Sequence, residues 1–287
     1  MKNNIELKQI CKSFHQKTVL NNITLHVEQG EIVGLLGPSG AGKTTLINII
    51  TGQLLPDKGT ILFDGMEMKK RDLSSVGIMM DDMGLYERLS VYDNLSFYAR
   101  LYQVNKKRIN HVLDGAGLAD AKKIPVHKLS KGMRNRVNFC RAILKDIHML
   151  FLDEPTAGLD PTTMKEIHRL ILSQKEKGTT ILLTTHNMYE AQSLCDHIAL
   201  LHQGTIIEYG TPEEICNRYN HLNQIIVVRK NGETITLNND KSCLPQLTAL
   251  IENEDISTIH STEPDLEKVF LESTTPVAGS RVCEPKS

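Results

Sequence analysis

A nine-residue glycine-rich stretch constrains the fold of this chain more than any other feature. It reads Gly37-Pro38-Ser39-Gly40-Ala41-Gly42-Lys43-Thr44-Thr45 and matches the pattern G-x-x-x-x-G-K-[ST]. The apolar run at residues 31–36 predicts a short buried strand before it. Residues 44–51 predict a helix after it, which Gly52 can end. The order strand, glycine-rich loop, helix is typical of a phosphate-binding α/β fold.

The residue types in this phosphate loop suit an anionic ligand. Glycine at positions 37, 40 and 42 lets backbone N–H groups approach phosphate without obstruction by side chains. The helix that begins near Lys43 directs the positive end of its dipole at the same anion. Lys43 adds a charge for the β- and γ-phosphates, and the Thr44 hydroxyl can ligate Mg²⁺. The loop therefore predicts a nucleotide triphosphatase, without deciding which kind.

Composition narrows the setting in which the chain works. Its 287 residues, 40% hydrophobic and 23% charged, suffice for one large or two smaller soluble domains. A formal net charge of −1 argues against binding to nucleic acid that is mainly electrostatic, so we expect no nucleic-acid partner. We expect no signal peptide and no bilayer-spanning segment, so that another subunit would cross any membrane. The six cysteines lack a C-x-x-C pair, which favours reduced packing residues in a cytosolic protein.

Local patterns predict three regions along the chain. Strand and helix signals alternate over residues 1–219, interrupted at about 82–135 by a mostly helical subdomain. Residues 5–10 and 20–27 predict antiparallel strands, with Phe14 in their connection. Residues 220–274 predict a small α+β accessory domain in which we identify no chemistry, and residues 275–287 predict a disordered tail.

A pair of acidic residues follows a second apolar strand. Asp153 and Glu154 come directly after residues 148–152, at the carboxyl end of the predicted strand. This end of a parallel sheet faces the crevice in which such sheets bind ligands. Asp153 can hold Mg²⁺ through its water shell, and Glu154 can polarise an attacking water.

Further motifs occur in a fixed order after the phosphate loop. They are Leu129-Ser130-Lys131-Gly132-Met133, Phe151-Leu152-Asp153-Glu154-Pro155-Thr156, Ala157-Gly158-Leu159-Asp160-Pro161, and His186 after Thr184-Thr185. With this set, residues 5–209 resemble the nucleotide-binding subunit of an ATP-binding cassette (ABC) transporter. The resemblance implies an α/β phosphate-loop fold with a RecA-like core sheet, an antiparallel β subdomain and a helical subdomain. A phosphate-loop kinase or GTPase would lack the 129–133 signature.

The resemblance also implies roles for individual residues. Two subunits would pair head to tail around two ATP molecules, with Glu154 as general base, His186 holding the γ-phosphate and water, and Lys43 assisting catalysis. Phe14, an edge or core aromatic if taken alone, falls at the adenine-stacking position. The implied ATP contacts are Phe14, Gly37, Pro38, Ser39, Gly40, Ala41, Gly42, Lys43, Thr44, Thr45 and, from the second subunit, Ser130 and Gly132. The implied Mg²⁺ contacts are Thr44, Asp153 and Asp81.

Two positions depart from the family pattern. Lys131 replaces the usual glycine of the signature, at a position that faces outward in the family, so we expect little effect on activity. Asp81 stands where the family usually has glutamine, and an aspartate is shorter and anionic beside phosphate. Our hypothesis is that Asp81 remains a Mg²⁺-linked sensor.

The single cassette and the short α+β tail resemble the antibiotic and multidrug export branch of the family. The resemblance implies a cytoplasmic subunit on the inner face of the cell membrane that hydrolyses ATP to power a separate permease. We expect export of an antibiotic, drug or peptide by a homodimer, with a heterodimer as an alternative. An importer cassette and a soluble, non-transport ABC ATPase stay open as alternative functions.

Overall fold

The computed structural model describes residues 4–67, 75–80, 84–220, 223–262 and 264–274. Contacts divide the chain into two compact units, Met1–Thr211 and Pro212–Ser287. Asp81 and the tail expected at residues 275–287 lie outside the described residues. Among the described helices, none combines the length and apolarity needed to cross a membrane.

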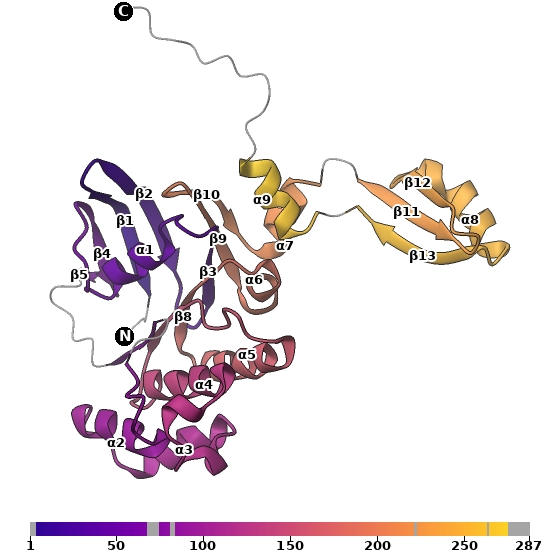
Figure 1. Cartoon of the computed structure of the whole chain (residues 1–287). Coiled ribbons are helices and arrows are strands. Elements are labelled where there is room, and N and C mark those ends of the chain that lie inside the picture. Colours follow the sequence, from indigo (N-terminus) through magenta and orange to yellow (C-terminus); the bar gives the residue numbers. More distant parts are fainter. Residues whose placement is uncertain (1–3, 68–74, 81–83, 221–222, 263, 275–287) are drawn as a thin grey trace, which may run out of the picture. The chain divides into compact units, whose positions relative to one another are not determined.

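The first unit is built on a six-stranded sheet (Figure 1). Its strands, in spatial order, are β10 (Thr205–Gly210), β9 (His197–His202), β3 (Ile32–Leu36), β8 (Thr180–Thr185), β7 (Met149–Asp153) and β6 (Val76–Met79). Neighbouring strands run parallel except β9 and β10, which form an antiparallel hairpin. Every residue of β3, β7 and β8 is buried, as expected for central parallel strands covered on both faces.

A four-stranded antiparallel sheet packs against this core both directly and through one helix. Its order is β2 (Lys17–Val27), β1 (Ile5–Phe14), β4 (Lys58–Phe63) and β5 (Met66–Glu67). Helix α1 (Lys43–Ile50) buries its apolar face in a core that draws residues from both sheets. Phe14 ends β1, where it pairs with Lys17, so its expected place in the connection was wrong. Pairing with β2 extends the strand beyond the local apolar alternation.

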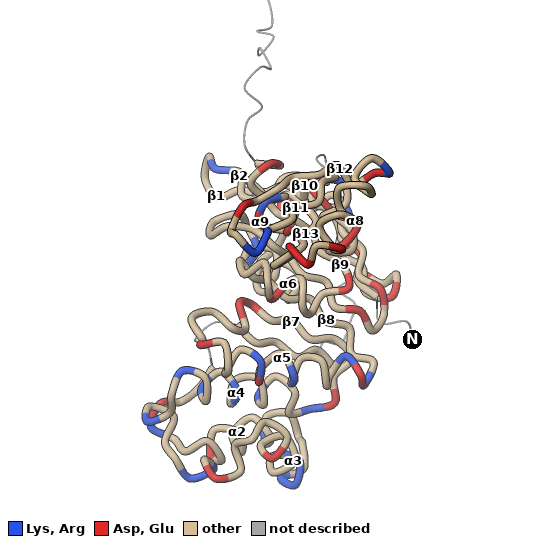
Figure 2. Tube along the Cα trace, turned by 90° about the vertical axis from the view of Figure 1, so that its right-hand side faces the viewer, with Lys and Arg blue, Asp and Glu red and all other residues tan. Residues whose placement is uncertain are grey.

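The helical part lies at the end of the first unit opposite the antiparallel sheet (Figures 1 and 2). It contains α2 (Val91–Leu101), α3 (Lys107–Gly115), α4 (Lys131–Ala142) and the 3₁₀ turns Ala119–Ala121 and Val126–Lys128. Ser90 caps α2 by accepting a hydrogen bond from the Asp93 N–H. Helix α4 runs on to Ala142 and so crosses residue 135, where we expected the helical subdomain to end. Helices α5 (Pro161–Lys175) and α6 (Met188–Leu194) follow β7 and β8.

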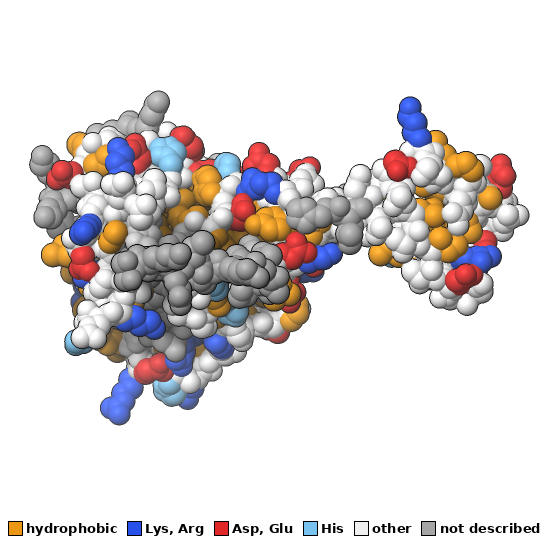
Figure 3. Space-filling model, turned by 90° about the horizontal axis from the view of Figure 1, so that it is seen from above, with side chains coloured by type: hydrophobic (Ala, Val, Ile, Leu, Met, Phe, Trp, Pro, Cys, Tyr) orange, Lys and Arg blue, Asp and Glu red, His pale blue; other side chains and the backbone are white. Residues whose placement is uncertain are grey.

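The second unit is a small α+β structure. Its elements are α7 (Pro212–Arg218), β11 (Gln224–Arg229), β12 (Thr234–Asn238), the 3₁₀ turn Lys241–Cys243, α8 (Leu244–Glu252), β13 (Ile256–Ser261) and α9 (Leu266–Thr274). The sheet order is β12, β11, β13, and apolar side chains also reach the unit's surface (Figure 3). The boundary expected between residues 219 and 220 lies instead after Thr211, because α7 packs against α9.

Candidate functional site

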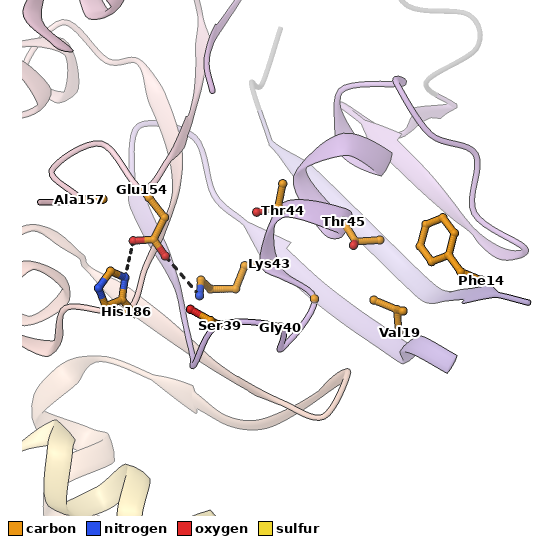
Figure 4. Close-up of a pocket in the computed structure, with 11 residues that line it drawn as sticks. Phe14, Val19, Ser39, Gly40, Lys43, Thr44, Thr45, Glu154, Ala157 and His186 are labelled. Carbon is orange, nitrogen blue, oxygen red and sulfur yellow. Dashed lines mark hydrogen bonds and ion pairs between the residues drawn. The ribbon is translucent and has the colours of Figure 1, made fainter. Parts of the chain in front are cut away.

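A cavity of about 580 Å³ brings the phosphate loop together with three distant segments of the first unit. The described residues that line it are Phe14, Val19, Ser39, Gly40, Gly42, Lys43, Thr44, Thr45, Glu154, Ala157 and His186. Figure 4 shows Phe14 and Val19 on one side of the loop and Glu154 and His186 on the other. The cavity therefore has an aromatic end and a charged end, joined by the backbone of the loop.

The loop between β3 and α1 holds its lysine in a defined place. Lys43 is only 7% exposed, and its ammonium donates to the carbonyl oxygens of Gly37 at 2.7 Å and Pro38 at 3.2 Å. Gly42 has φ +110°, and a Cβ there would lie 2.7 Å from Leu20 Cδ2. Glycine is therefore required at position 42 by both backbone conformation and packing. Pro38 and Ala41, also expected to contact ATP, belong to the same loop.

Two oxygen ligands of the kind that Mg²⁺ prefers lie beside the loop. The Thr44 hydroxyl is 3.3 Å from Oδ1 of Asp153, which ends β7 and also accepts a hydrogen bond from the Thr184 hydroxyl. In the described part of the chain, no cluster of three or more His, Cys, Asp or Glu side chains could hold a metal. Mg²⁺ at nucleotide sites typically takes only one or two protein oxygens and completes its octahedron with phosphates and water. Thr44 and Asp153 fit that requirement.

Glu154 bridges two other functional side chains. Its Oε1 lies 3.3 Å from Nζ of Lys43, and its Oε2 lies 2.7 Å from Nδ1 of His186. The backbone at Glu154 has φ +49°, a left-handed conformation that is unfavourable for a residue with a side chain. Its N–H donates to the carbonyl and the hydroxyl of Thr184, which hold this conformation. The turn after β7 therefore aims the carboxylate at the loop.

The signature residues occupy the start of α4. Ser130 caps this helix by accepting a hydrogen bond from the Met133 N–H, and its side chain is exposed. Gly132 is buried against α5, where an added Cβ would lie 2.3 Å from Cγ2 of Thr163. Neither Ser130 nor Gly132 is among the described residues that line the cavity. The exposed Lys131 places its ammonium beside Gly158.

Three residues of the site were not predicted from the sequence to be site residues. Val19 and Ala157 line the cavity, and Thr184 supports both acidic residues. Ala157 and Thr184 belong to two of the motifs that carry the family resemblance, but no role was expected for either side chain. Val19 carries no chemical signal in the sequence, and it lies on β2 in the hairpin that also contains Phe14.

Comparison with known proteins settles the family. The ABC transporter family model matches residues 20–157. A lantibiotic transport ATP-binding protein of Streptococcus pyogenes is 34% identical over 229 residues, which are 79% of this chain and 99% of the relative. The chain belongs to the ATP-binding proteins of the ABC transporter family. This ABC protein therefore binds and hydrolyses ATP, as the family implies.

Two further relatives and a solved structure support the same family assignment. A fluoroquinolone-export ATP-binding protein of Mycobacterium tuberculosis is 37% identical over 256 residues, covering 86% of this chain and 85% of the relative. A linearmycin resistance ATP-binding protein of Bacillus subtilis is 34% identical over 221 residues, 75% of this chain and 71% of the relative. The structure of an ATP-binding subunit of an ABC transporter has a TM-score of 0.68 at 29% identity, covering 75% of this chain and 92% of that one. The expected ABC cassette fold is confirmed.

Proposed function

We propose that this ABC protein is the ATP-hydrolysing subunit of an exporter, and that it powers a separate membrane permease for an antibiotic, drug or peptide. The observation that carries ATP hydrolysis is the bridge from Lys43 through Glu154 to His186 at the phosphate loop. The direction of transport is supported by the functions of the relatives, which are lantibiotic transport, linearmycin resistance and fluoroquinolone export. These functions favour export over the importer alternative.

The proposed reaction begins with ATP in the cavity. Phe14, at its aromatic end, stacks on adenine, and the backbone N–H groups of residues 37–45 bind the phosphates. Lys43 neutralises charge on the β- and γ-phosphates. Glu154 accepts a proton from the attacking water, which then adds to the γ-phosphorus as the bond to ADP breaks. His186 orients Glu154 and contacts the γ-phosphate, and the products are ADP and phosphate.

Thr44 and Asp153 would hold Mg²⁺ in this site, and Asp81 remains a proposed third contact. When bound, Mg²⁺ would neutralise negative charge that develops on the phosphates. Asp153 itself accepts a hydrogen bond from Thr184, which fixes the carboxylate toward Thr44. Both side chains are therefore oriented by the protein before any cation arrives.

A second copy of the chain is proposed to complete each site. Ser130 and Gly132 lie at the amino end of α4, where backbone N–H groups and the helix dipole attract anions. Because they do not line the cavity of their own chain, we assign them to the γ-phosphate bound by a partner. This arrangement supports a head-to-tail homodimer with two equivalent sites.

The proposed permease contact is on the helical part. Tyr86, Phe97 and Leu101 are exposed there, and the rings of Tyr86 and Phe97 meet edge to face at 5.2 Å. An exposed apolar surface of this kind suits a cytoplasmic segment of a membrane protein. We therefore place the subunit in the cytoplasm, peripheral to the inner face of the cell membrane.

Replacing Glu154 with glutamine tests the reaction and the paired sites together. Glu154→Gln removes the proton acceptor while keeping the side-chain volume, so turnover is expected to disappear and ATP to trap a dimer. ATPase assays and size-exclusion chromatography with light scattering measure both effects, with the exposed Glu67→Gln as control. A Glu154→Gln chain that stays monomeric with ATP bound would contradict the paired-site proposal.

Affinity purification from detergent-solubilised membranes of the source cell tests the transport role. The tagged chain is expected to recover a multispanning membrane protein, and Phe97→Ser is expected to lower that recovery while basal ATPase activity is unchanged. Recovery of ribosomes instead would support a soluble translation ATPase and reject the transport role.

A further inference from the structure

A fully buried carboxylate is connected to the two segments that carry Glu154 and His186, and among the described residues it forms no hydrogen bond or ion pair with either of them. Glu190, in the first turn of α6, is 0% exposed. Its Oε1 accepts a hydrogen bond from the Thr156 hydroxyl at 2.8 Å and lies 3.3 Å from Nε2 of His168 on α5. Thr156 and His168 are also buried. The mechanism proposed above uses none of these three side chains.

The carboxylate joins the two segments that present the site residues. Thr156 follows Glu154 by two residues, in the turn after β7. Asn187, next to His186, caps α6 by accepting a hydrogen bond from the Glu190 N–H at 3.2 Å. A bond from Thr156 to Glu190 therefore sets how far the turn after β7 lies from the start of α6.

Stability of the fold does not by itself explain why Glu190 is buried here. Burying a carboxylate away from water costs free energy that a single hydrogen bond and one histidine do not fully offset. The second oxygen, Oε2, has no hydrogen-bond partner among the described residues. Apolar side chains of similar volume in place of Thr156, His168 and Glu190 would fill the same space without leaving a buried polar side-chain atom unsatisfied.

We infer that Glu190 and Thr156 are positioning residues for ATP hydrolysis, and that their buried hydrogen bond sets the spacing of Glu154 and His186. The inference rests on the proposed catalytic roles of that pair. The pair needs such support because the backbone of Glu154 is held in a left-handed conformation and the His186 side chain is 58% exposed. The contact from Glu190 to His168 also connects the Thr156–Glu190 hydrogen bond to α5.

The experiment compares Thr156→Val, which removes the hydroxyl, with Thr156→Ser, which keeps it. In the purified full-length protein, Thr156→Val is expected to lower kcat about 10- to 100-fold with KM for ATP nearly unchanged, because misplaced groups slow chemistry more than binding. Thr156→Ser is expected to restore kcat close to the wild-type value. Thr51→Val is the matched control, since Thr51 is also buried and its hydroxyl donates a hydrogen bond to the Ile47 carbonyl in α1.

Thermal melts show whether each variant is folded, and Thr156→Ala replaces Thr156→Val if valine is not accommodated. A folded Thr156→Val protein with wild-type kcat would overturn the inference. So would equal losses in Thr156→Val and Thr51→Val, or a failure of Thr156→Ser to recover activity. Absence of hydrolysis by the wild-type chain would instead overturn the proposed function on which the inference rests.

Discussion

Oε2 of Glu154 lies 2.7 Å from Nδ1 of His186, although the two residues are 32 positions apart in the chain. They meet because β7 and β8 are adjacent parallel strands, and each residue directly follows its strand. Glu154 also contacts Lys43, which follows β3 on the other side of β8. The carboxyl ends of three strands thus deliver one base, one imidazole and one ammonium to a single place.

His186→Ala should slow hydrolysis without abolishing ATP binding. Loss of the imidazole frees the Glu154 carboxylate to turn away from the attacking water, so kcat is expected to fall about 100-fold. Steady-state ATPase assays measure the change, and His111→Ala on the exposed face of α3 is the control. An unchanged kcat in His186→Ala would reject a role for this residue.

Phe14→Ala should weaken the binding of ATP but not of inorganic tripolyphosphate. Stacking of a base on an aromatic ring contributes about 1–3 kcal/mol, and Phe14→Tyr should keep it because the ring remains. Calorimetric titration with both ligands separates loss of stacking from damage to the phosphate loop. Equal weakening of both ligands would show that the ring does not recognise the base.

Asp153→Asn should raise the Mg²⁺ concentration needed for half-maximal ATPase activity. The amide is neutral and holds a divalent cation less strongly than a carboxylate. We expect a shift of about tenfold, corresponding to about 1.4 kcal/mol of lost Mg²⁺ affinity. Thr44→Ser keeps its hydroxyl and should stay near the wild-type value. A Mg²⁺ requirement unchanged by Asp153→Asn would remove this residue from the proposed site.

Gly132→Ala should destabilise the protein, because its new methyl group would overlap Cγ2 of Thr163. Overpacking of this kind costs about 1–3 kcal/mol. Adding Thr163→Ser removes that methyl group while keeping the hydroxyl, so part of the loss should be recovered. Gly115→Ala on α3 is the control, since a Cβ there meets nothing within 4 Å. Urea denaturation measures all three variants, and equal stability of Gly132→Ala and Gly115→Ala would contradict the predicted overlap.

Asp160→Ala should lower the melting temperature by removing the cap of α5. Hydrogen bonds, first from the Thr163 hydroxyl and then from the backbone N–H groups of Thr163 and Thr162, lower the pKa of Asp160 in the folded protein. Because the pKa of Asp160 is lower in the folded than in the unfolded protein, the ionised carboxylate stabilises the folded state at pH values above its pKa in the unfolded protein. This stabilisation is lost as the pH falls through its pKa in the folded protein. The difference in melting temperature should therefore be constant from pH 5 to 8 and shrink only below about pH 3.9.

Asp160→Asn provides the matched control, because asparagine accepts the same backbone hydrogen bonds. It should keep most of the stability that Asp160→Ala loses. A difference between wild type and Asp160→Ala that already shrinks between pH 8 and 5 would show that another group controls it.

Local pattern predicted most elements but missed those that depend on a partner. The sequence of residues 244–252 predicts a helix because its apolar spacing is regular, and α8 has these limits, Leu244–Glu252. Strand β5 was not predicted, because its two residues are too few to show a periodic pattern. It forms by pairing with β4. Helix α7 has only seven residues, and the sequence around it does not indicate a helix. It packs on α9.

By itself, the sequence determined which chemistry is available and in what order it occurs. Glycine at position 42, the cation of Lys43 and the carboxylates of Asp153 and Glu154 are requirements of residue type, readable from spacing alone. Only the tertiary structure decided which groups meet. The contacts of Glu154 with Lys43 and His186 follow from the order of parallel strands in the sheet. The bond from Thr156 to Glu190 follows from the same packing. Strand order is set by interactions between distant segments, so no local period encodes it.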